Sequence, residues 1–491
     1  MSLLRKLAGQ TAVYGLSSVL GRMLNYLLVP LYTTVFIPGE YGIVTELYAY
    51  VAFFNILYIY GLETAYFRFS SQDSGYNYFN LAFSSILISS IILSGIGYWF
   101  SDEIAILLQY EGRGNLIRWL MAILAIDAIV AIPFAYLRQS GKATKFAVFK
   151  LSNITVNIGL NLFFLVFCPW FLNDRPDHFL QLIYNPDLGV GYVFLSNLIA
   201  NGMYLLFFIP LWLKARLTFS LLEWKKMMNY AWPVLLIGFA GVTNEMLSRA
   251  ILKYRLPEGF YEGYSNLEIV GIFGACYKLS IFMILAVQAF RYAFEPFFFA
   301  KASDKNSPEL FAKIMTWFVI FTSFSWLFIS VLLPYIAPIF LRQESYTVAL
   351  DAVPWLLGGG LFLGVFYNLS LWYKLTNKTI LGAWISIIGA ATTLVLNWIL
   401  IPVIGYMGSA IATFFTYFLM VVISYFWGRK HYPVPYHIRK NLLYIIGAGS
   451  GILLDAQFND SVIFTVIVVL IFLTLTFLFE KAKFKNLRTN G

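Results

Sequence analysis

The stretch LSSVLGRMLNYLLVPLYTTVF, residues 16–36, is apolar along nearly its whole length, with Arg22 and Asn25 as polar interruptions near its start. A transmembrane helix needs about 20 apolar residues, and this stretch is long enough. A permanent cation inside such a helix is costly, because the bilayer centre offers no water to solvate it. The stretch therefore predicts a membrane-spanning helix whose polar side chains face something other than lipid.

The rest of the chain has the composition of an integral membrane protein. Of its 491 residues, 60% are hydrophobic and 12% are charged, and the mean hydropathy is +0.74. Such values are typical of a chain that is solvated by a bilayer. We predict an all-α polytopic membrane protein with about fourteen spanning helices, at residues 8–36, 41–64, 78–100, 115–138, 146–168, 189–213, 228–253, 268–299, 309–333, 347–373, 379–402, 406–428, 438–455 and 460–479.

The positions of the basic residues predict how these helices are oriented. With the N-terminus inside, the inner segments carry 24 of the 34 lysines and arginines, and the outer segments carry 6. Short cytoplasmic loops hold such an excess of positive charge. We therefore expect a multi-pass protein of the inner, cytoplasmic membrane with both termini in the cytoplasm. The net charge of +10 follows from this asymmetry and does not indicate a nucleic-acid partner.

Enzymatic chemistry has little support in the sequence. The longest predicted outer connection, about residues 169–188, is too short to fold as a catalytic domain. The phosphate-binding GxxxxGK, the HExxH and the GxSxG patterns do not occur. Cys168 and Cys276 lie in apolar segments, without other ligands at a metal-binding spacing. We expect a transporter of the secondary type with no catalytic residues, no cofactor and no metal site.

The chain also contains a weak internal repeat. Residues 41–70 and 270–299 align without gaps at five identical positions of thirty, and the sequence around Asn161 resembles that around Asn397. Both similarities correspond to a shift of six helices, which keeps the helix direction and so predicts parallel repeats. We predict a six-helix bundle in residues 1–220, a second in 221–430 and two further helices with a basic tail in 431–491. A central cavity would lie between the two bundles.

Three motifs are similar to those of a known family. NWILIPVIGYMGSAIAT, residues 397–413, resembles the Asn, Pro, Gly and small-residue signature of bacterial oligosaccharide-lipid flippases of the polysaccharide-transporter family. That family belongs to the multidrug/oligosaccharidyl-lipid/polysaccharide exporter superfamily. Residues 136–164 look like its helix 4–5 connection, and residues 30–50 resemble its helix 1–2 hairpin. In all, the resemblance covers about residues 8–480.

The resemblance implies a specific function. A flippase of this kind moves a polyprenyl-diphosphate carrying an oligosaccharide from the inner to the outer membrane face, by alternating access, for polysaccharides of the cell envelope such as lipopolysaccharide. Its expected partners are the lipid-linked oligosaccharide, membrane lipids and a polysaccharide polymerase or glycosyltransferase.

Several ionisable residues lie within the predicted helices, and each must face protein, a partner or a water-filled cavity. Within two helices, opposite charges stand four residues apart and can neutralise each other, namely Glu245 with Arg249 and Arg291 with Glu295. Arg22 and Lys278 have no such neighbour in their own helices. A diphosphate suits these cations, because arginine offers forked donors and lysine a point charge. The diphosphate-binding candidates are Arg22, Lys278, Arg249 and Arg291.

The energy source is left open among membrane potential, protons and sodium. Acidic side chains within the helices are the candidates for cation coupling or for charge pairing, and these are Glu46, Asp127, Glu245 and Glu295. The amides of Asn25 and Asn244 are candidates for the polar lining of the cavity. Six intramembrane amides could meet sugar hydroxyls, but hydrogen bonds between helices are the expected default for all of them, namely Asn25, Asn55, Asn157, Asn161, Asn244 and Asn397.

Two other functions are compatible with parts of the sequence. A multidrug or organic-cation antiporter of the same superfamily would prefer an acidic cavity, which Arg22 and Lys278 disfavour. A membrane glycosyltransferase, polymerase or ligase would use the same lipid-linked sugars, but such enzymes carry large outer loops that this chain lacks.

Overall fold

The computed structural model describes residues 20, 21, 23, 24, 26–72, 76–175, 178–301, 307–376, 378–458 and 462–489. Over these residues the chain is built from helices joined by short connections, and it contains no β-strand. The predicted all-α fold is confirmed. The chain divides into two compact units, residues 1–250 and 251–491, here called unit 1 and unit 2.

Among the described residues, ten helices are long and apolar enough to cross a membrane, or eleven if one bent pair counts as a single span. The bent pair consists of α13 (Asn266–Leu279) and α14 (Ile281–Lys301), which meet at 42°. The helix Gly191–Phe207 is apolar but shorter. About half of the predicted first span, 8–36, lies outside the described residues, so the count of fourteen stays a prediction. The chain is a multi-pass membrane protein.

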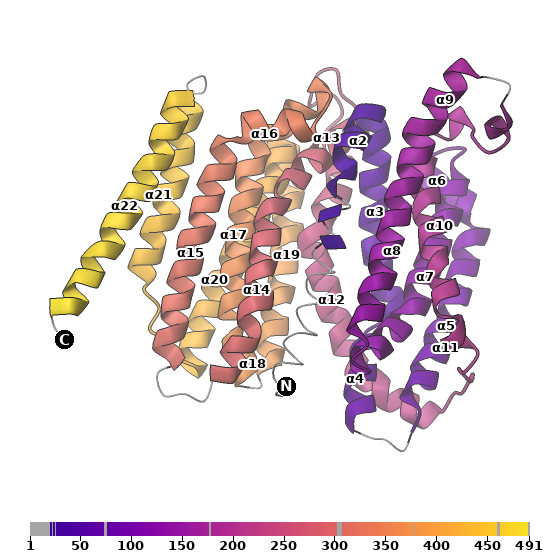
Figure 1. The fold of residues 1–491 in the computed structure, drawn as a ribbon, viewed down its shortest axis with the longest axis horizontal. Helices are drawn as coiled ribbons and strands as arrows, with labels where there is room; N and C mark the ends of the chain where they lie inside the picture. The colour runs from indigo at the N-terminus through magenta and orange to yellow at the C-terminus, as the bar shows by residue number, and fades with distance from the viewer. Residues whose placement is uncertain are drawn as a thin grey trace. The chain divides into compact units, whose positions relative to one another are not determined.

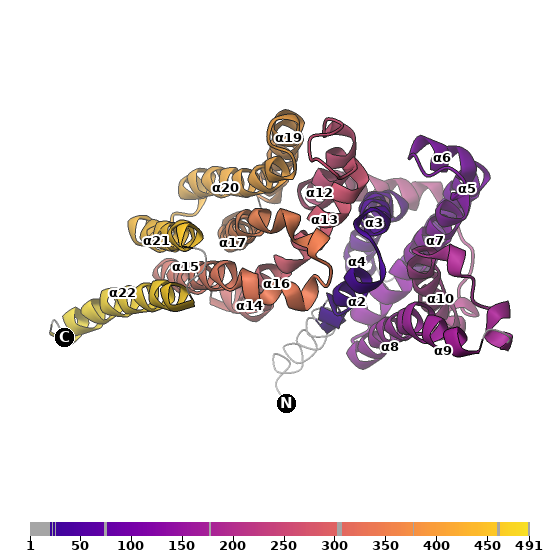
Figure 2. The same ribbon diagram turned by 90° about the horizontal axis from the view of Figure 1, so that it is seen from above.

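Unit 1 is arranged around α7 (Gly114–Gln139), which contacts helices on all sides (Figures 1 and 2). Its neighbours are α3 (Pro38–Ile59), α4 (Leu62–Gln72), α5 (Tyr78–Trp99), α6 (Ser101–Leu107), α8 (Ala143–Leu162) and α10 (Gly191–Phe207). The other helices are α2 (Leu28–Val35), α9 (Cys168–Asp174), α11 (Ile209–Trp212) and most of α12 (Leu221–Arg255). Three short helical turns complete it, namely η1 (Phe163–Phe167), η2 (Phe179–Leu182) and η3 (Pro186–Leu188).

The core of unit 1 combines large and small apolar side chains. Leu81 and Ile86 of α5 pack with Ala128 and Ile132 of α7, and all four are fully buried. Helices in a bilayer gain little from the hydrophobic effect and associate through close packing, which small residues such as Ala128 permit. This packing holds α7 rigidly, and α7 carries Asp127.

The predicted span 41–64 is broken in the structure. Tyr60 and Gly61 both have positive φ angles, 35° and 76°, and they separate α3 from α4. A Cβ at Gly61 would lie 2.5 Å from the backbone oxygen of Ala231, so this position needs glycine for both conformation and space. The apolar pattern continues through the break, which is why the sequence alone predicted an uninterrupted helix.

Unit 2 is arranged around α17 (Val353–Leu369), which contacts α13, α14, α15 (Ser307–Val331), α18 (Leu371–Leu375) and α20 (Tyr406–His431) (Figure 1). Close approach depends on glycine, since a Cβ at Gly358 would lie 2.7 Å from the ring of Phe414. The remaining elements are α16 (Leu333–Phe340), η4 (Glu344–Ala352), α19 (Thr379–Ile404), α21 (Ile438–Gln457) and α22 (Val462–Thr489).

The turn between α19 and α20 is tight and depends on glycine. Gly405 adopts a φ of 61° between the two helices, and a Cβ at Gly408 would lie 2.7 Å from the backbone of Leu400. These two glycines therefore permit the turn and the close approach of the helices. The predicted span 379–402 ends at Pro402, but α19 continues to Ile404.

The predicted repeat has a local counterpart in the hydrogen bonds. The amide nitrogen of Asn161 donates to the backbone oxygen of Asn157 at 2.8 Å, and that of Asn397 donates to Thr393 at 2.8 Å. Both asparagines are fully buried. The division into residues 1–220, 221–430 and 431–491 and the central cavity stay predictions.

Candidate functional site

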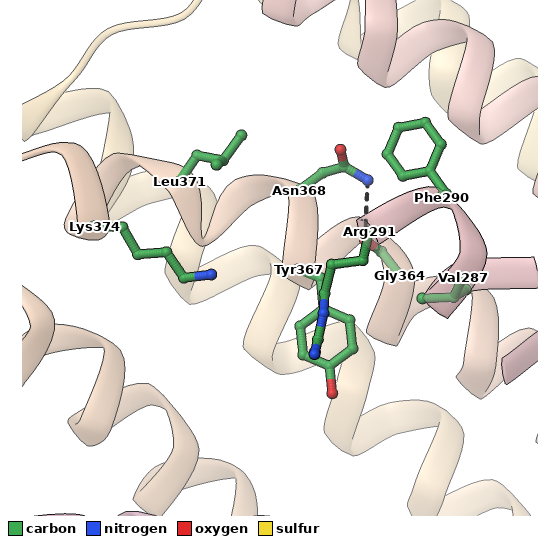
Figure 3. Close-up of a pocket in the computed structure, with 8 residues that line it drawn as sticks. All are labelled: Val287, Phe290, Arg291, Gly364, Tyr367, Asn368, Leu371 and Lys374. Atoms are coloured by element: carbon green, nitrogen blue, oxygen red, sulfur yellow. Dashed lines mark hydrogen bonds between the residues drawn. The ribbon is translucent and has the colours of Figure 1, made fainter. Parts of the chain in front are cut away.

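A small pocket in unit 2 brings two basic side chains together (Figure 3). It holds about 20 Å³, which is room for about one water molecule. Helix α14 contributes Arg291, and α17 and α18 contribute the polar residues opposite it. The complete lining is Val287, Phe290, Arg291, Gly364, Tyr367, Asn368, Leu371 and Lys374.

Aromatic and amide groups position the polar side chains of this pocket. The guanidinium carbon of Arg291 lies 5.0 Å from the ring centre of Tyr367, which is a cation–π distance. The amide nitrogen of Asn368, which is 6% exposed, donates to the backbone oxygen of Gly364 at 3.2 Å. Lys374 extends toward them from α18 (Figure 3). Guanidinium, ammonium and amide donors in one pocket are suited to an anion with several acceptor oxygens.

Lys374 was not among the expected site residues, because it was counted among the 24 basic residues of the inner segments, which orient the protein in the membrane. The structure places it in α18, directly after Ser370, whose hydroxyl donates to the backbone oxygen of Tyr367 at 2.6 Å. Lys374 follows Tyr367 by seven residues, or about two helical turns, so both face the same side. This seven-residue spacing is the sequence feature from which Lys374 could have been predicted to lie near Tyr367.

A second polar group links three helices inside unit 1. Asp127 of α7 accepts a hydrogen bond from the amide of Asn201 in α10 at 2.9 Å. Asn201 in turn accepts one from the amide of Asn153 in α8, also at 2.9 Å. One turn earlier on α8, the Lys150 ammonium lies 4.3 Å from the ring centre of Phe134 and 5.2 Å from that of Tyr204.

The polar face continues along α8. Lys150, Asn153, Asn157 and Asn161 follow each other at intervals of three and four residues, so they share one side of the helix. The Tyr32 hydroxyl donates to the Asn161 side-chain oxygen at 2.9 Å, which confirms the expected hydrogen bond between helices. Lys150, like Lys374, was counted among the 24 basic residues of the inner segments, although it stands near the start of the predicted span 146–168. Its place in the helix shows that the positive charge belongs to the interior of unit 1.

Glu46 of α3 is fully enclosed. Its carboxylate accepts hydrogen bonds from the hydroxyls of Tyr50, at 2.9 Å, and of Tyr110. Hydrogen bonds to a carboxylate are strong because the acceptor is charged. This environment favours a role in joining α3 to the segment before α7, while cation coupling at Glu46 stays a prediction.

The candidate residues of α12 and α13 differ in exposure. Arg249 is 5% exposed and donates to the sulfur of Met246 at 3.1 Å, whereas Glu245 is exposed. The predicted pairing of Arg249 with Glu245 stays a prediction. Asn244 is buried, and Lys278 of α13 is half-buried.

Three expected site residues have side chains that the structure does not describe. Arg22 and Asn25 lie outside the described residues, and so does the side chain of Glu295. Their roles as diphosphate, cavity and charge-pair candidates stay predictions.

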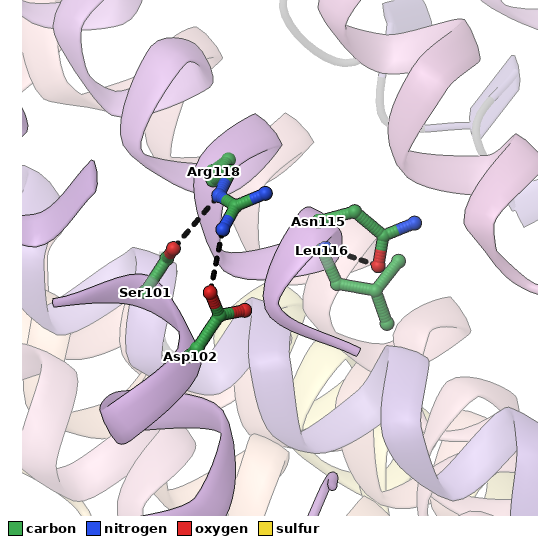
Figure 4. A network of polar contacts seen from close by, with 5 residues as sticks. All are labelled: Ser101, Asp102, Asn115, Leu116 and Arg118. Atoms are coloured by element: carbon green, nitrogen blue, oxygen red, sulfur yellow. Dashed lines mark hydrogen bonds and ion pairs between the residues drawn. The ribbon is translucent and has the colours of Figure 1, made fainter. Parts of the chain in front are cut away.

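A larger hollow lies between α5 and α7 in unit 1, with a volume of about 530 Å³. Tyr98, Asn115, Arg118 and Trp119 are among its lining residues. Figure 4 shows that Arg118 is already engaged, since it donates to the Ser101 hydroxyl at 2.8 Å and to the Asp102 carboxylate at 2.6 Å. The ion pair neutralises the guanidinium, so this hollow is less suited to a diphosphate than the pocket of Arg291.

Comparison with known proteins shows which families and folds this chain resembles. The model of a family described as polysaccharide biosynthesis protein matches residues 35–170. The structure of the lipid II flippase MurJ in an inward closed conformation is similar with a TM-score of 0.68 and 14% identity, over 96% of this chain and 99% of that chain. The chain shares the fold of this flippase.

Two structures of a multidrug resistance MATE family transporter of the MOP superfamily have a similar fold. An inward-facing structure is similar with a TM-score of 0.62 and 15% identity, over 88% of this chain and 95% of that chain. An outward-facing structure is similar with a TM-score of 0.57 and 14% identity, over 89% of this chain and 96% of that chain. No curated protein matches the sequence. The resemblance expected from the motifs is therefore confirmed by the family model and by the MOP fold.

Proposed function

We propose that this protein is a flippase that moves polyprenyl-diphosphate-linked oligosaccharide from the inner to the outer face of the cytoplasmic membrane, for cell-surface polysaccharide biosynthesis. The family model, whose description is polysaccharide biosynthesis protein, supports the pathway. The fold shared with a lipid II flippase supports transport of a lipid-linked substrate. The exchange between the two membrane faces would occur by alternating access, with both termini in the cytoplasm.

The observation that carries the proposal is that Arg291 and Lys374 line one pocket together with Asn368 and Tyr367. A diphosphate offers several acceptor oxygens and more than one negative charge. The guanidinium can hold two oxygens at once, and the ammonium can compensate a further charge. The amide and the phenol are suited to sugar hydroxyls or phosphate oxygens.

Cargo binding requires this pocket to open. Its volume of about 20 Å³ admits a water molecule but not a diphosphate. Helix α14 is separated from α13 by Ser280, where the pair bends by 42°. A movement of α14 about this bend would separate Arg291 from α17, which is the kind of hinge motion that membrane transporters use.

The other predicted site residues enter this proposal in their expected roles. Arg22, Lys278 and Arg249 are further diphosphate candidates, and Asn25 and Asn244 are candidates for sugar contacts. Cation coupling is assigned to Asp127 first, because it is half-buried in a polar network. A polymerase or glycosyltransferase remains the expected protein partner.

The similarity to MATE structures favours a second candidate, an organic-cation antiporter. The basic pocket argues against it, because two cations repel a cationic cargo. Loss of a flippase would make the cell accumulate lipid-linked oligosaccharide on the inner membrane face, whereas loss of an antiporter would make it accumulate the organic cation.

The experiment compares Arg291→Gln and Lys374→Gln with wild type in cells, with Lys430→Gln as the control because Lys430 is exposed. We expect both pocket variants to reach the membrane in normal amounts and to accumulate intact lipid-linked oligosaccharide on the inner face, whereas the control behaves as wild type. Altered glycan chain length would indicate an enzyme instead. Normal export by both pocket variants would contradict the proposal.

A further inference from the structure

We propose that the hollow between α5 and α7 in unit 1 binds a membrane phospholipid whose headgroup carries both a phosphate and an ammonium group, as in phosphatidylethanolamine. The volume of the hollow, about 530 Å³, is within the range of small-molecule sites. The hollow lies at the ends of two membrane-spanning helices, because α5 ends at Trp99 and α7 begins at Gly114. It is separate from the pocket of Arg291, and the proposal does not depend on the cargo.

The lining of this hollow changes from polar to apolar along the helices. Asn115 and Arg118 stand in the first two turns of α7, and Tyr98 stands in the last turn of α5. Gly95 and Ala122 line the hollow at least one turn further into the two spans. Asn115 and Ala122 are separated by about 10 Å along the helix axis. A phospholipid has the same order, with its headgroup at the membrane surface and its acyl chains below.

The deeper part of the hollow is suited to an acyl chain. The hydroxyl of Ser94 in this part is already engaged, since it donates to the backbone oxygen of Met121 at 2.9 Å and lies 3.0 Å from the hydroxyl of Tyr58. Gly95 leaves open space, because nothing lies within 4 Å of the position that a Cβ would take there. An apolar chain can therefore enter while the Ser94 hydroxyl keeps its partners.

The polar end of the hollow presents both charges of an ion pair. One terminal nitrogen of Arg118 donates to one carboxylate oxygen of Asp102 at 2.6 Å, and Nε donates to the Ser101 hydroxyl at 2.8 Å (Figure 4). Among the described residues, the second terminal nitrogen and the second carboxylate oxygen have no hydrogen-bond partner. The side chains of Arg118 and Asp102 are 39% and 65% exposed, so a ligand can reach both.

Two neighbours complete this polar end. The guanidinium carbon of Arg118 lies 5.6 Å from the ring centre of Tyr98, which is a cation–π distance. The Asn115 side-chain oxygen accepts from the backbone nitrogen of Leu116 at 3.0 Å, and within the described part of the chain its amide nitrogen has no partner. Arg118 and Asn115 thus offer donors to a phosphate, and Asp102 offers an acceptor to an ammonium group.

These charges favour a zwitterionic headgroup over an anionic one. The pair of Arg118 and Asp102 has no net charge, and neither has phosphatidylethanolamine. A phosphate at Arg118 and an ammonium at Asp102 extend the pair into an array in which each charge has an opposite neighbour. An anionic lipid would bring a phosphate close to Asp102 without a compensating cation. The quaternary ammonium of phosphatidylcholine has no N–H group to donate to Asp102.

The test follows thermal unfolding of the purified full-length protein in detergent, with no cargo present. Dioleoyl-phosphatidylethanolamine, dioleoyl-phosphatidylcholine or dioleoyl-phosphatidylglycerol is added at equal mole fraction. We expect phosphatidylethanolamine to raise the melting temperature of wild type more than either other lipid. Soluble phosphoethanolamine carries the same charges without acyl chains, and we expect no stabilisation by it at the concentration at which the lipid saturates.

Three variants assign the response to the two ends of the hollow. Gly95→Leu fills the apolar part without a clash, and Arg118→Gln removes the main phosphate donor. Each should raise the phosphatidylethanolamine concentration for half-maximal stabilisation by at least about tenfold, which corresponds to the loss of a charge-assisted contact or of its apolar equivalent. Asp102→Asn should abolish the preference for phosphatidylethanolamine over phosphatidylcholine.

Two controls match these changes. Gly159→Leu places the same side chain at a glycine of α8 that also has open space around it. Arg113→Gln removes an exposed arginine that directly precedes α7 and is not part of the lining. Both controls should respond to phosphatidylethanolamine as wild type does.

Equal stabilisation of wild type by all three lipids would overturn the proposal. So would folded Gly95→Leu and Arg118→Gln variants that respond to phosphatidylethanolamine as wild type does, or full stabilisation by phosphoethanolamine alone. If Arg118→Gln does not fold, Gly95→Leu alone decides in the same way. Because no cargo takes part, these outcomes leave the flippase proposal untouched, and a failure of the Arg291 variants leaves this proposal untouched.

Discussion

Arg291 of α14 lies over the ring of Tyr367 of α17, with 5.0 Å between the guanidinium carbon and the ring centre. The contact joins the helix that follows the bend at Ser280 to the central helix of unit 2. It also holds the guanidinium in the same pocket as Lys374. The ring covers the flat side of the guanidinium and not its edge, where the N–H groups point.

The ring of Tyr367 should matter more than its hydroxyl. Tyr367→Leu removes the cation–π contact, worth about 0.5–2 kcal/mol, and should raise the cargo concentration needed for half-maximal flipping by about two- to thirtyfold. Tyr367→Phe keeps the ring and should stay within about twofold of wild type. The concentration dependence of flipping in proteoliposomes measures both. Equal losses in the two variants would show that the hydroxyl carries the role.

Gly61 should be irreplaceable in the break between α3 and α4. Its φ of 76° and the 2.5 Å from a Cβ to the Ala231 oxygen predict that Gly61→Ala destabilises unit 1 by about 1–3 kcal/mol. Gly159→Ala in α8 is the matched control, because nothing lies within 4 Å of its Cβ position. A glycine to alanine change inside a helix should be neutral or stabilising by up to about 1 kcal/mol. The melting temperatures of the purified variants test this prediction. A Gly61→Ala variant that melts at the same temperature as wild type would contradict the requirement for glycine at this break.

Glu46 should serve stability more than transport. Glu46→Gln replaces a charged acceptor of two tyrosine hydroxyls by a neutral amide, and we expect a loss of about 1–3 kcal/mol in the free energy of unfolding. Tyr110→Phe should lose less, because the bond from Tyr50 remains. The flipping rate per folded molecule should not change. A full-length, stable Glu46→Gln that fails to flip would instead assign Glu46 to cation coupling.

Much of the fold could be predicted, because a membrane-spanning helix requires a long apolar segment that can be recognised in the sequence. The turn at Gly405 was also predictable, since glycine at a helix junction favours a positive φ. The break at Gly61 and the bend at Ser280 could not be read, because the apolar pattern runs through both. These interruptions depend on contacts with other helices, such as the approach of Ala231 to Gly61.

The candidate site was only partly predictable for a related reason. Asp127 and Arg291 were recognised as charges inside apolar helices, and the structure places both in polar groups. Lys150 and Lys374 were missed, because a lysine near a helix end also serves to orient the protein in the membrane. Only the tertiary packing shows that their ammonium groups turn back into the helical units.

The most direct measurement reconstitutes the purified protein in liposomes that carry a fluorescent saccharide on a polyprenyl diphosphate and follows its transfer between the leaflets. We predict rapid transfer by wild type and Lys430→Gln, and at least about tenfold slower transfer by Arg291→Gln and Lys374→Gln, since each loses a charge-assisted contact to phosphate. Liposomes in which wild type leaves this lipid in its original leaflet but moves an organic cation would contradict the account.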